Sequence, residues 1–547
     1  MDAGWEALER GDWAVALDVF TAAVAQSDEP RTLEGLAWAS WWSNDGAGVF
    51  TSRERAFKLY RQRDDPVAAA RVAIWLGCDH HDFRGEHAVA NGWYQRARRL
   101  LAKVPTCVEA GWLAFQEGAY ALELEDDTAT ARARAAEVAG IAAALDHADL
   151  EFLSLALEGL ALVTEGAVSE GMRRLDEVGV AATTGELQDR IATAWSLCYL
   201  IYACERVRDF DRASQWCARM QEIATRFVFD LGMGVCRAHY GGVLVLHGRW
   251  DLAELELAAA GETLARSRPL AAVESAVRVG ELRRRQGRVA EAEKLFAESV
   301  PHPLAVVGLA SIAFDHGAQQ QAVEMLEDLL ATTPAASVTQ RADALELLAR
   351  ARSSLGDADG ARAAAADLRS VAESVGTRPL QAMAAVADAA VAAACGDDNL
   401  ARRHLEDGVE LYDRSGLPYE AECARTDLAR TLARLGRGKA ADSHARRAAD
   451  RLRALGALYA AQRAERAARS TDATSDAPIL GLSPRETEVI ALLAQGLSDR
   501  ELAERLHISA HTAHRHVSNI LTKLGLPSRA AAAALAARHG LGPPVSS

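Results

Sequence analysis

The chain has 547 residues, of which 50% are hydrophobic, a composition typical of a soluble globular protein with room for several domains and sizeable buried cores. Its formal net charge of −15 would argue against a nucleic-acid partner if the charge were spread uniformly, but it is not. From residue 479 onward there are seven Lys/Arg and five Asp/Glu, a balance of +2, which leaves −17 for the rest of the chain. Only the C-terminal segment is therefore suited to a negatively charged partner.

The N-terminal sequence and the spread of charged residues give no sign of a membrane. The start, MDAGWE, lacks a basic region followed by an apolar run, and no stretch of about twenty residues is free of charges. We therefore expect a cytoplasmic protein without membrane contact. The eight cysteines are scattered and form no C-x-x-C pair, which favours reduced thiols packed as small apolar residues over a disulfide or zinc framework.

A three-residue pattern recurs along most of the chain before residue 470. A glycine or polar turn residue is followed five positions later by a small residue, usually alanine, and nine positions later by a residue that is usually apolar. The copies are Gly11, Ala16, Phe20; Gly85, Ala90, Tyr94; Gly166, Gly171, Leu175; Gly248, Ala253, Leu257; Gly287, Ala292, Phe296; Gly317, Ala322, Leu326; Gly356, Ala361, Ala365; Gly396, Ala401, Leu405; and Gly436, Ala441, Ala445. Weaker copies begin near Asp126 and Arg208, and one unit between Gly11 and Gly85 is poorly marked.

Most steps of this pattern are about 40 residues, the length of two helices and their turns. The glycine would end the first helix in a left-handed cap, and the small residue and its i+4 neighbour would share one face of the second helix. The pattern predicts an all-α fold in which helical hairpins stack as a solenoid. It resembles tetratricopeptide-type repeats in architecture, although the unit is longer and that family's signature tryptophan and proline positions are not kept in each copy.

Tryptophan is concentrated at the N-terminal end of the chain. Eight of the eleven tryptophans precede Gly118, and three of them lie within residues 33–42. Two interpretations remain open: an aromatic-lined pocket, or tryptophans that cap one end of the solenoid, which we favour.

Few residues elsewhere suggest chemistry. Cys78, His80, His81 and His87 are of types that bind metals, but adjacent histidines on a helix face apart, so we expect no metal site. The acidic run at 123–127 is expected to be a solvated turn rather than a catalytic pair. No phosphate loop of the form G-x-x-x-x-G-K-[ST] occurs, nor a nucleophile with a base at recognisable spacing, so we expect neither a cofactor nor an enzyme.

The segment 470–478 is small and polar throughout and is predicted to be a flexible linker. Helix start signals follow it at regular intervals. Three serines have a capping partner three residues on: Ser483 with Glu486, Ser498 with Glu501, and Ser509 with Thr512. The first two pairs are capping boxes, so the spacing predicts three capped helices in succession.

The third of these helices has two distinct faces. Its apolar residues recur at the spacing of one buried stripe: Ala513, Val517, Ile520, Leu521 and Leu524. The opposite stripe is polar and hydrogen-bonding: His511, Arg515, Ser518 and Thr522, with His514 alongside. This is the arrangement expected of a helix that lies in the major groove of DNA.

The C-terminal motifs LSPRETEVI (482–490), GLSDRELA (496–503), ISAHTAHRHVSNI (508–520) and KLGL (523–526) together resemble the helix-turn-helix of LuxR-type transcription regulators. The resemblance places His514, Arg515 and Ser518 where this family reaches base edges. It implies these DNA-binding candidates: His511, Thr512, His514, Arg515, His516, Ser518, Lys523 and Arg529, of which Thr512, His516, Lys523 and Arg529 take phosphate-contact or supporting positions. Two departures from the family are Ala513, where valine is usual, and His514, where lysine or arginine is usual.

These patterns together predict a bacterial transcription regulator. A tetratricopeptide-like sensor or scaffold at 1–469 would be joined by the linker at 470–478 to a LuxR-type helix-turn-helix domain at 479–543. The expected partners are double-stranded DNA, bound as a dimer, and a peptide, protein or small-molecule effector on the repeats. The alternative is an interaction scaffold whose terminal domain mainly dimerises.

Overall fold

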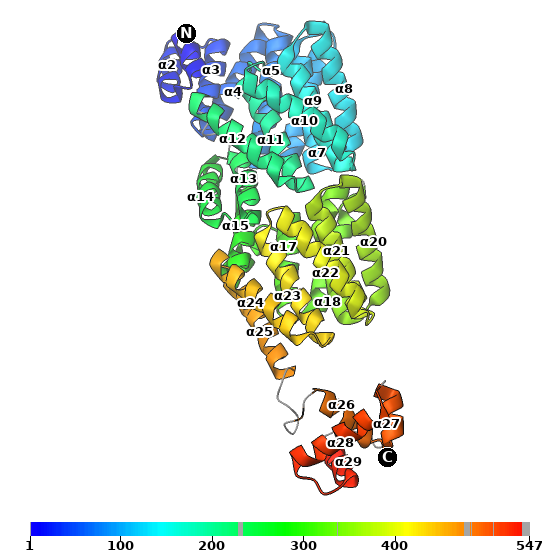
Figure 1. The fold of residues 1–547 in the computed structure, drawn as a ribbon. Coiled ribbons are helices and arrows are strands. Elements are labelled where there is room, and N and C mark those ends of the chain that lie inside the picture. The colour runs from blue at the N-terminus through cyan, green and yellow to red at the C-terminus, as the bar shows by residue number, and fades with distance from the viewer. Residues whose placement is uncertain are drawn as a thin grey trace.

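The structure is a computed structural model that describes residues 2–227, 234–267, 269–335, 337–474, 482, 484–506 and 508–538. Across these ranges the regular elements are helices, and no strand occurs. Figure 1 shows the helices following one another in chain order from the N-terminal end to a small C-terminal group. The all-α fold class predicted from the sequence is confirmed.

The first half of the solenoid contains α1 (Asp2–Arg10), α2 (Trp13–Gln26), α3 (Pro30–Trp42), α4 (Gly46–Gln62), α5 (Pro66–Arg84), α6 (His87–Leu101), α7 (Val108–Leu124), α8 (Thr128–Leu145), α9 (Ala148–Glu165), α10 (Val168–Thr184), α11 (Arg190–Val207) and α12 (Phe210–Phe227).

The second half contains α13 (Gly234–Leu246), α14 (Trp250–Ser267), α15 (Pro269–Gln286), α16 (Val289–Glu298), α17 (Pro303–Asp315), α18 (Gln319–Thr332), the short 3₁₀ helix η1 (Val338–Arg341), α19 (Ala342–Leu355), α20 (Ala358–Val375), α21 (Arg378–Ala394), α22 (Asp398–Arg414), α23 (Pro418–Arg434), α24 (Gly438–Leu455) and α25 (Leu458–Thr474).

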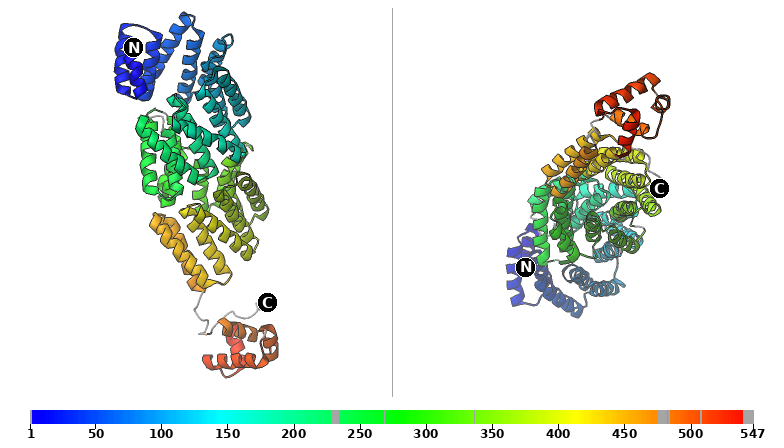
Figure 2. Two further views of the ribbon diagram at one scale, coloured as in Figure 1. Left: turned by 45° about the horizontal axis from the view of Figure 1, so that its top comes forward. Right: turned by 90° about the horizontal axis from the view of Figure 1, so that it is seen from below.

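These helices pair as antiparallel hairpins and form two layers. Each odd-numbered helix packs on the even-numbered helix that follows it, and odd-numbered helices also contact one another, as in the series α9, α11, α13 and α15. The odd-numbered helices, which we call the inner helices, therefore form a layer that is continuous from α5 to α21. Seen from below in Figure 2, the hairpins curl around a common axis, so the fold is a superhelical solenoid.

The glycines of the repeat end the first helix of each hairpin in the left-handed conformation, as predicted. All nine have positive φ, between 65° at Gly85 and 92° at Gly166. The weakly marked copies make the same turn without glycine, since Asn44, Asp126 and Arg208 have φ of 59°, 50° and 58°. The unit between Gly11 and Gly85 was thus hidden by an asparagine at its turn, a residue that tolerates this conformation.

The small and apolar positions of the repeat lie in the core. The second and third residues of all nine copies are buried. Phe296 shows why small residues recur on the facing helices: a Cβ on Gly308 would lie 2.4 Å from its ring and one on Gly280 2.7 Å. The third residue of the pattern therefore inserts between the inner helices of two adjacent hairpins, where only glycine leaves room.

Successive turns of the superhelix touch each other. Helix α5 contacts α15, α15 contacts α25, and α10 contacts α20, so the contact recurs every ten helices. Thr377 donates a hydrogen bond to the Val207 carbonyl (2.7 Å) across this boundary. The solenoid is therefore a closed coil rather than an open ribbon.

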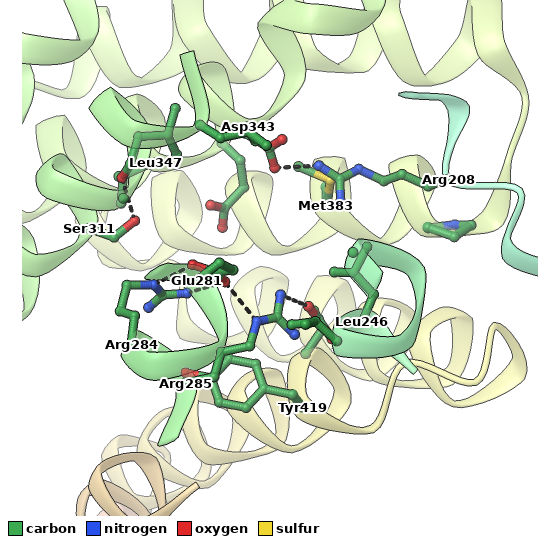
Figure 3. A pocket seen from close by; sticks show the side chains of 18 of the residues that line it. Arg208, Leu246, Glu281, Arg284, Arg285, Ser311, Asp343, Leu347, Met383 and Tyr419 are labelled. Carbon is green, nitrogen blue, oxygen red and sulfur yellow. Dashed lines mark hydrogen bonds and ion pairs between the residues drawn. The ribbon is translucent and has the colours of Figure 1, made fainter. Parts of the chain in front are cut away.

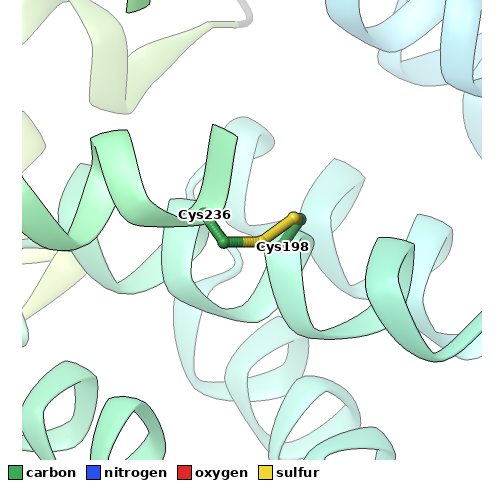
Figure 4. Close-up of a disulfide and its surroundings, with 2 residues drawn as sticks. All are labelled: Cys198 and Cys236. Carbon is green, nitrogen blue, oxygen red and sulfur yellow. A yellow bond between two sulfur atoms is a disulfide. The ribbon is translucent and has the colours of Figure 1, made fainter. Parts of the chain in front are cut away.

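One expectation about the cysteines is wrong, because Cys198 of α11 and Cys236 of α13 form a disulfide (Figure 4). The two residues are 38 positions apart, close to one repeat, and their Cα atoms are 5.2 Å apart. Neighbouring inner helices bring equivalent positions face to face, and this is why a search for C-x-x-C pairs missed the bridge. Of the other cysteines, Cys78, Cys204 and Cys217 are buried free thiols, as expected.

The boundary of the expected linker also differs from the structure. Helix α25 continues to Thr474, because neither glycine nor proline occurs between Leu458 and Thr474. The rest of the expected linker, at 475–478, lies outside the described residues.

The C-terminal group has its own hydrophobic core. It comprises α26 (Pro484–Leu493), α27 (Asp499–Leu506), α28 (Ala510–Leu524) and α29 (Arg529–Arg538). The core residues come from all four helices and include Val489, Leu502, Val517 and Ala532. This core is separate from those of the solenoid.

Candidate nucleic-acid interface and central cavity

The two faces of α28 lie as the sequence predicted. Ala513, Val517 and Ile520 are buried in the core, and Leu521 and Leu524 pack against it. The opposite face is exposed at His511, His514, Arg515, Ser518 and Thr522, while Thr512 and His516 are partly buried. Seven candidate residues are thereby brought together on one helix: His511, Thr512, His514, Arg515, His516, Ser518 and Lys523.

The helix starts in this domain are capped by side chains. Ser509 Oγ accepts from the Thr512 amide (3.1 Å). In the capping box before α27, the Ser498 amide donates to Glu501 Oε2 (2.7 Å) and Ser498 Oγ accepts from the Glu501 amide (3.4 Å). The predicted caps of α27 and α28 are confirmed, whereas Ser483 of the first box lies outside the described residues.

Asp499 at the start of α27 binds two of the candidate cationic groups. His514 Nδ1 lies 2.9 Å from Asp499 Oδ2, and Arg529 pairs with Asp499 Oδ1. Burial would raise the pKa of Asp499, yet the Arg529 and His514 side chains hold it below its ordinary value. Arg529 also donates to the Leu497 carbonyl, so it ties the start of α29 to the start of α27.

The other two basic candidates differ from each other. Lys523 Nζ donates to Glu486 Oε2 of α26 (2.8 Å). Arg515 is exposed and has no hydrogen-bond or ion-pair partner in the part of the chain that the structure describes. Arg515 is therefore the candidate whose guanidinium fork is ready for a new partner.

The acidic partners Asp499 and Glu486 are residues that the sequence reasoning did not connect with the site. The sequence gives Glu486 a role only as the capping partner of Ser483, and it gives Asp499 no role. Their pairing depends on how α26 and α27 cross α28, and sequence spacing does not give this crossing.

A second candidate site is a cavity of about 600 Å³ inside the solenoid. It is lined mainly by the odd-numbered helices from α11 to α25, together with η1. Figure 3 shows Glu281 beside Arg284 and Arg285, with Tyr419 next to Arg285 and with Leu347 and Met383 farther along the wall. The lining is thus part charged and part apolar.

An ionic network forms one wall of this cavity. Arg278 of α15 donates to Glu205 of α11 (2.6 and 2.9 Å) and to Glu274 (2.6 Å), while His239 of α13 lies 2.5 Å from Glu205. Burial would raise the pKa of Glu205, but Arg278 and His239 lower it to about 2. The carboxylate is therefore ionised and links three inner helices.

The acidic run was expected to be a solvated turn, and this is only partly correct. Asp127 caps α8 by accepting from the Thr130 amide (2.9 Å). Asp126 accepts from Gln340 (2.9 Å), which belongs to the next turn of the superhelix, and Glu123 accepts from Tyr199 (2.6 Å). Glu123 and Asp126 also line the cavity.

The N-terminal tryptophans do more than cap the end of the solenoid, but they do not line the central cavity. Trp13 and Trp42 stack at 4.5 Å in the terminal hairpins, as expected of an end cap. Trp38, Trp75 and Trp112 continue as a chain of ring contacts along α3, α5 and α7. No tryptophan is among the residues that line the 600 Å³ cavity.

The histidines considered as metal ligands have other contacts. His80 Nδ1 lies 2.6 Å from Glu86 Oε2, and the Nδ1 atoms of His81 and His87 are 3.1 Å apart. No group of three or more His, Cys, Asp or Glu that could hold a metal occurs among the described residues. None of the helices described is both long enough and apolar enough to span a membrane.

The C-terminal segment matches the family model of bacterial regulatory proteins, luxR family, over residues 480–536. Residues 480–536 therefore form a LuxR-type helix-turn-helix domain. A matching relative is the transcriptional regulatory protein LnrK of Bacillus subtilis, 44% identical over 63 residues, which are 12% of this chain and 29% of LnrK. Another is the transcriptional activator protein BjaR1 of Bradyrhizobium diazoefficiens, 47% identical over 62 residues, 11% of this chain and 26% of BjaR1. The match thus spans less than a third of either relative.

Two solved structures resemble the chain over a longer range. A chain of the APC/C hetero-tetramer Cut9-Hcn1 has a TM-score of 0.42 and 14% identity, covering 98% of this chain and 95% of its own length. The Rap protein complexed with Competence and Sporulation Factor has a TM-score of 0.38 and 15% identity, covering 71% and 99%.

Proposed function

We propose that this protein is a sequence-specific, DNA-binding transcription regulator. The observation that carries the proposal is the exposed polar face of α28, which stands on a capped and separately packed domain of LuxR type. His514, Arg515 and Ser518 would reach base edges, with His511 beside them. Thr512, His516 and Lys523 would contact phosphates. Arg529, held by Asp499, would mainly support the domain.

We propose further that the solenoid, at 1–469, senses a ligand or partner and transmits its state to the DNA-binding domain, at 479–543. The cavity of about 600 Å³ supports this role, since its volume lies within the range of small-molecule sites. Helix α25 both lines the cavity and ends at Thr474, just before the DNA-binding domain. We expect the protein to act in the cytoplasm, as a dimer on adjacent half-sites.

A mobility-shift assay with fragments of the protein's own upstream region tests the proposal. We expect the full chain to shift one fragment in preference to competitor DNA, and a chain ending at residue 478 to shift none. If the two chains behave alike while the full chain forms a stable dimer, the terminal domain serves assembly, and an interaction scaffold becomes the better description.

A further inference from the structure

The last hairpin of the solenoid is basic, unlike the solenoid before it. Residues 437–474, which span α24, α25 and the turn residue before them, contain nine Lys/Arg and four Asp/Glu, a balance of +5. Residues 1–436 contain 45 Lys/Arg and 66 Asp/Glu, a balance of −21. At 0.1 M salt, exposed charges more than about 10 Å apart are largely screened from each other. A partner that lies on this hairpin therefore meets its local positive charge.

Four cations of the hairpin are exposed and unpaired. They are Arg437, Lys439, Arg447 and Arg466, which have no hydrogen-bond or ion-pair partner within the described ranges. The carboxylates of α24 are bound by other arginines, because Asp442 pairs with Arg446 (2.8 Å) and Asp450 with Arg453 (3.0 Å). The hairpin's own acidic residues thus leave these four charges free.

Three of the four cations lie together on α24. Lys439 and Arg447 are eight residues apart, so they lie about two turns apart along one side of the helix. Arg437 is the residue directly before the helix and is close to Lys439. We call Arg437, Lys439 and Arg447 the basic surface.

The stability of the hairpin does not account for this surface. In the two preceding hairpins, Asp357 and Asp397 hold the position of Arg437, and each caps the following helix by accepting from a backbone amide (3.0 and 2.9 Å). Arg437 makes no side-chain cap. An arginine also stands at this position before α14 and α16, but those helices have an acidic residue in the first turn and α24 has none. Cations at the positive end of a helix are unfavourable to it, so the basic surface costs the hairpin stability.

The basic surface lies at the end of the solenoid from which the chain continues to the DNA-binding domain. Helices α24 and α25 pack as an antiparallel hairpin, so the start of α24 lies beside the end of α25 at Thr474. Ten residues lead from Thr474 to Pro484 at the start of α26, and this length of chain spans at most about 35 Å. One helical turn of DNA is about as long. A duplex held by α28 therefore extends within reach of the surface.

We propose that the basic surface binds the phosphate backbone of DNA beside the site held by α28, as a second and sequence-independent contact. The DNA-binding domain has a balance of +2 and does not attract the surface, whereas duplex DNA carries one negative charge per about 1.7 Å. Residues 1–478 have a balance of −17, so the surface acts only on a duplex that the domain already holds. In this respect the inference rests on the proposed function.

The salt dependence of DNA binding tests the surface without a specific site. Fluorescence anisotropy measures the affinity of the full chain for a random-sequence duplex of about 40 base pairs between about 50 and 200 mM salt. Each phosphate contact contributes about 0.9 to the slope of log affinity against log salt. The triple variant Arg437→Ala, Lys439→Ala, Arg447→Ala should therefore have a slope less steep by about two to three.

Two further variants separate the charge of the surface from other effects. The matched control removes three exposed, unpaired cations from the N-terminal hairpins and should keep the parent slope: Lys58→Ala, Arg99→Ala, Lys103→Ala. The variant Arg437→Lys, Arg447→Lys keeps the charges and should also keep the slope, since either side chain binds a phosphate.

The length of the DNA tests where the contact falls. On the site from the protein's own upstream region, the parent chain should bind at least about tenfold more tightly when the flanks are about 20 base pairs long than when they are about 5. The triple variant should not distinguish the two lengths, because it lacks the contact beside the site.

The outcomes separate this proposal from the proposed function. An unchanged slope in the triple variant, or an equal change in the matched control, overturns the surface; if the chain still prefers its upstream fragment, the proposed function stands. A chain without sequence preference whose slope falls in the triple variant keeps the surface and loses the sequence-specific function. Failure of the full chain to bind either duplex overturns both. If the triple variant loses binding to phosphatidylserine vesicles while its slope on DNA is unchanged, the surface belongs to a membrane.

Discussion

Asp499 sets the state of the candidate DNA-binding surface in the absence of DNA. It binds His514 through one carboxylate oxygen and Arg529 through the other. His514 stands where LuxR-type domains usually have lysine or arginine, and here it is paired with Asp499. Arg515 is therefore the cationic side chain on the exposed face of α28 that is best placed to bind DNA. The discrimination between DNA sequences should therefore depend mainly on Arg515.

The first prediction compares Arg515 with Lys523. Arg515→Ala should lower affinity for the preferred site by about 1–3 kcal/mol and relax specificity, because a bidentate contact to a base edge is lost. Lys523→Ala should weaken binding to all sequences alike and reduce the salt dependence, because a phosphate contact is lost. Competitive mobility-shift titrations measure both, with the exposed solenoid residue Arg10→Ala as control. Equal losses on specific and random DNA from both variants would contradict the assignment of faces.

A second prediction concerns Arg529, which the structure ties to Asp499 and to the Leu497 carbonyl. Arg529→Ala should destabilise the C-terminal domain by about 1–3 kcal/mol, since a part-buried carbonyl and a carboxylate lose their donor. Arg529→Lys should recover only part of this loss, because a lysine cannot bond to both acceptors in the same planar geometry. Thermal unfolding of residues 476–547 measures the effect. If DNA affinity falls while the unfolding midpoint is unchanged, Arg529 is a phosphate contact instead.

At the scale of single elements, the hairpins were predictable because their turns leave a local signal. Glycine at the end of the first helix identified nine turns, and the structure gives all nine positive φ. The turn at Asn44 was not recognised in the sequence, because asparagine is compatible with many other backbone conformations. The end of α25 was predicted too early, at the start of the polar segment 470–478, because polar residues alone do not end a helix.

The cavity and the acidic partners of the DNA-binding surface could not be predicted. Their pairs join residues far apart in the sequence, such as Glu205 with Arg278 and Arg285 with Glu420. The contacts around the cavity arise from the curvature of the whole coil, which accumulates from small rotations between hairpins. No local sequence pattern specifies this accumulated curvature. The contacts of Asp499 and Glu486 depend instead on how α26 and α27 cross α28.

The third prediction uses the ionic network around Glu205. Its folded pKa of about 2 is below the ordinary value of 4.5, so the network stabilises the fold fully above about pH 4.5 and loses this effect as the pH falls toward 2. Glu205→Gln should therefore be less stable than the parent chain at neutral pH and lose less stability on acidification. Urea unfolding of both chains at neutral and acidic pH measures this, with the exposed Glu298→Gln as control. Parallel losses of stability with pH in all three chains would refute it.

A fourth prediction follows from the disulfide between α11 and α13. It closes a loop of 38 residues, so its reduction should lower the free energy of unfolding by about 3–4 kcal/mol on the chain-entropy estimate. Denaturant unfolding with and without dithiothreitol measures the change. A Cys198→Ala, Cys236→Ala chain should be insensitive to the reductant. A parent chain that is equally insensitive would mean that these cysteines are not bridged in solution.

At the scale of the whole molecule, the C-terminal domain has little surface for pairing with a second copy. Ala532 and Ala536 of α29 are buried in the domain's own core, and Leu535, the one large apolar residue of that helix, is itself partly buried. By resemblance, this helix pairs two domains in the LuxR family. Here the remaining alanine surface can contribute only a small apolar area.

The fifth prediction is that residues 476–547 are monomeric in solution at low micromolar concentration. Two domains would then be brought together by adjacent half-sites and by pairing of the solenoids. Sedimentation of this segment and of the full chain measures both states. A stable dimer of the isolated segment would place assembly in α29 and remove the need for the solenoid.

The contacts that recur every ten helices restrict how this architecture can evolve by gaining or losing repeats. In an open solenoid, a hairpin can be inserted or deleted at small cost, because each hairpin meets only its neighbours. Here α5, α15 and α25 lie in register, and the loss of one hairpin would move every later helix against the wrong position of the preceding turn. The number of repeats is thus fixed by the geometry of the coil, and duplication or loss would have to proceed by whole turns.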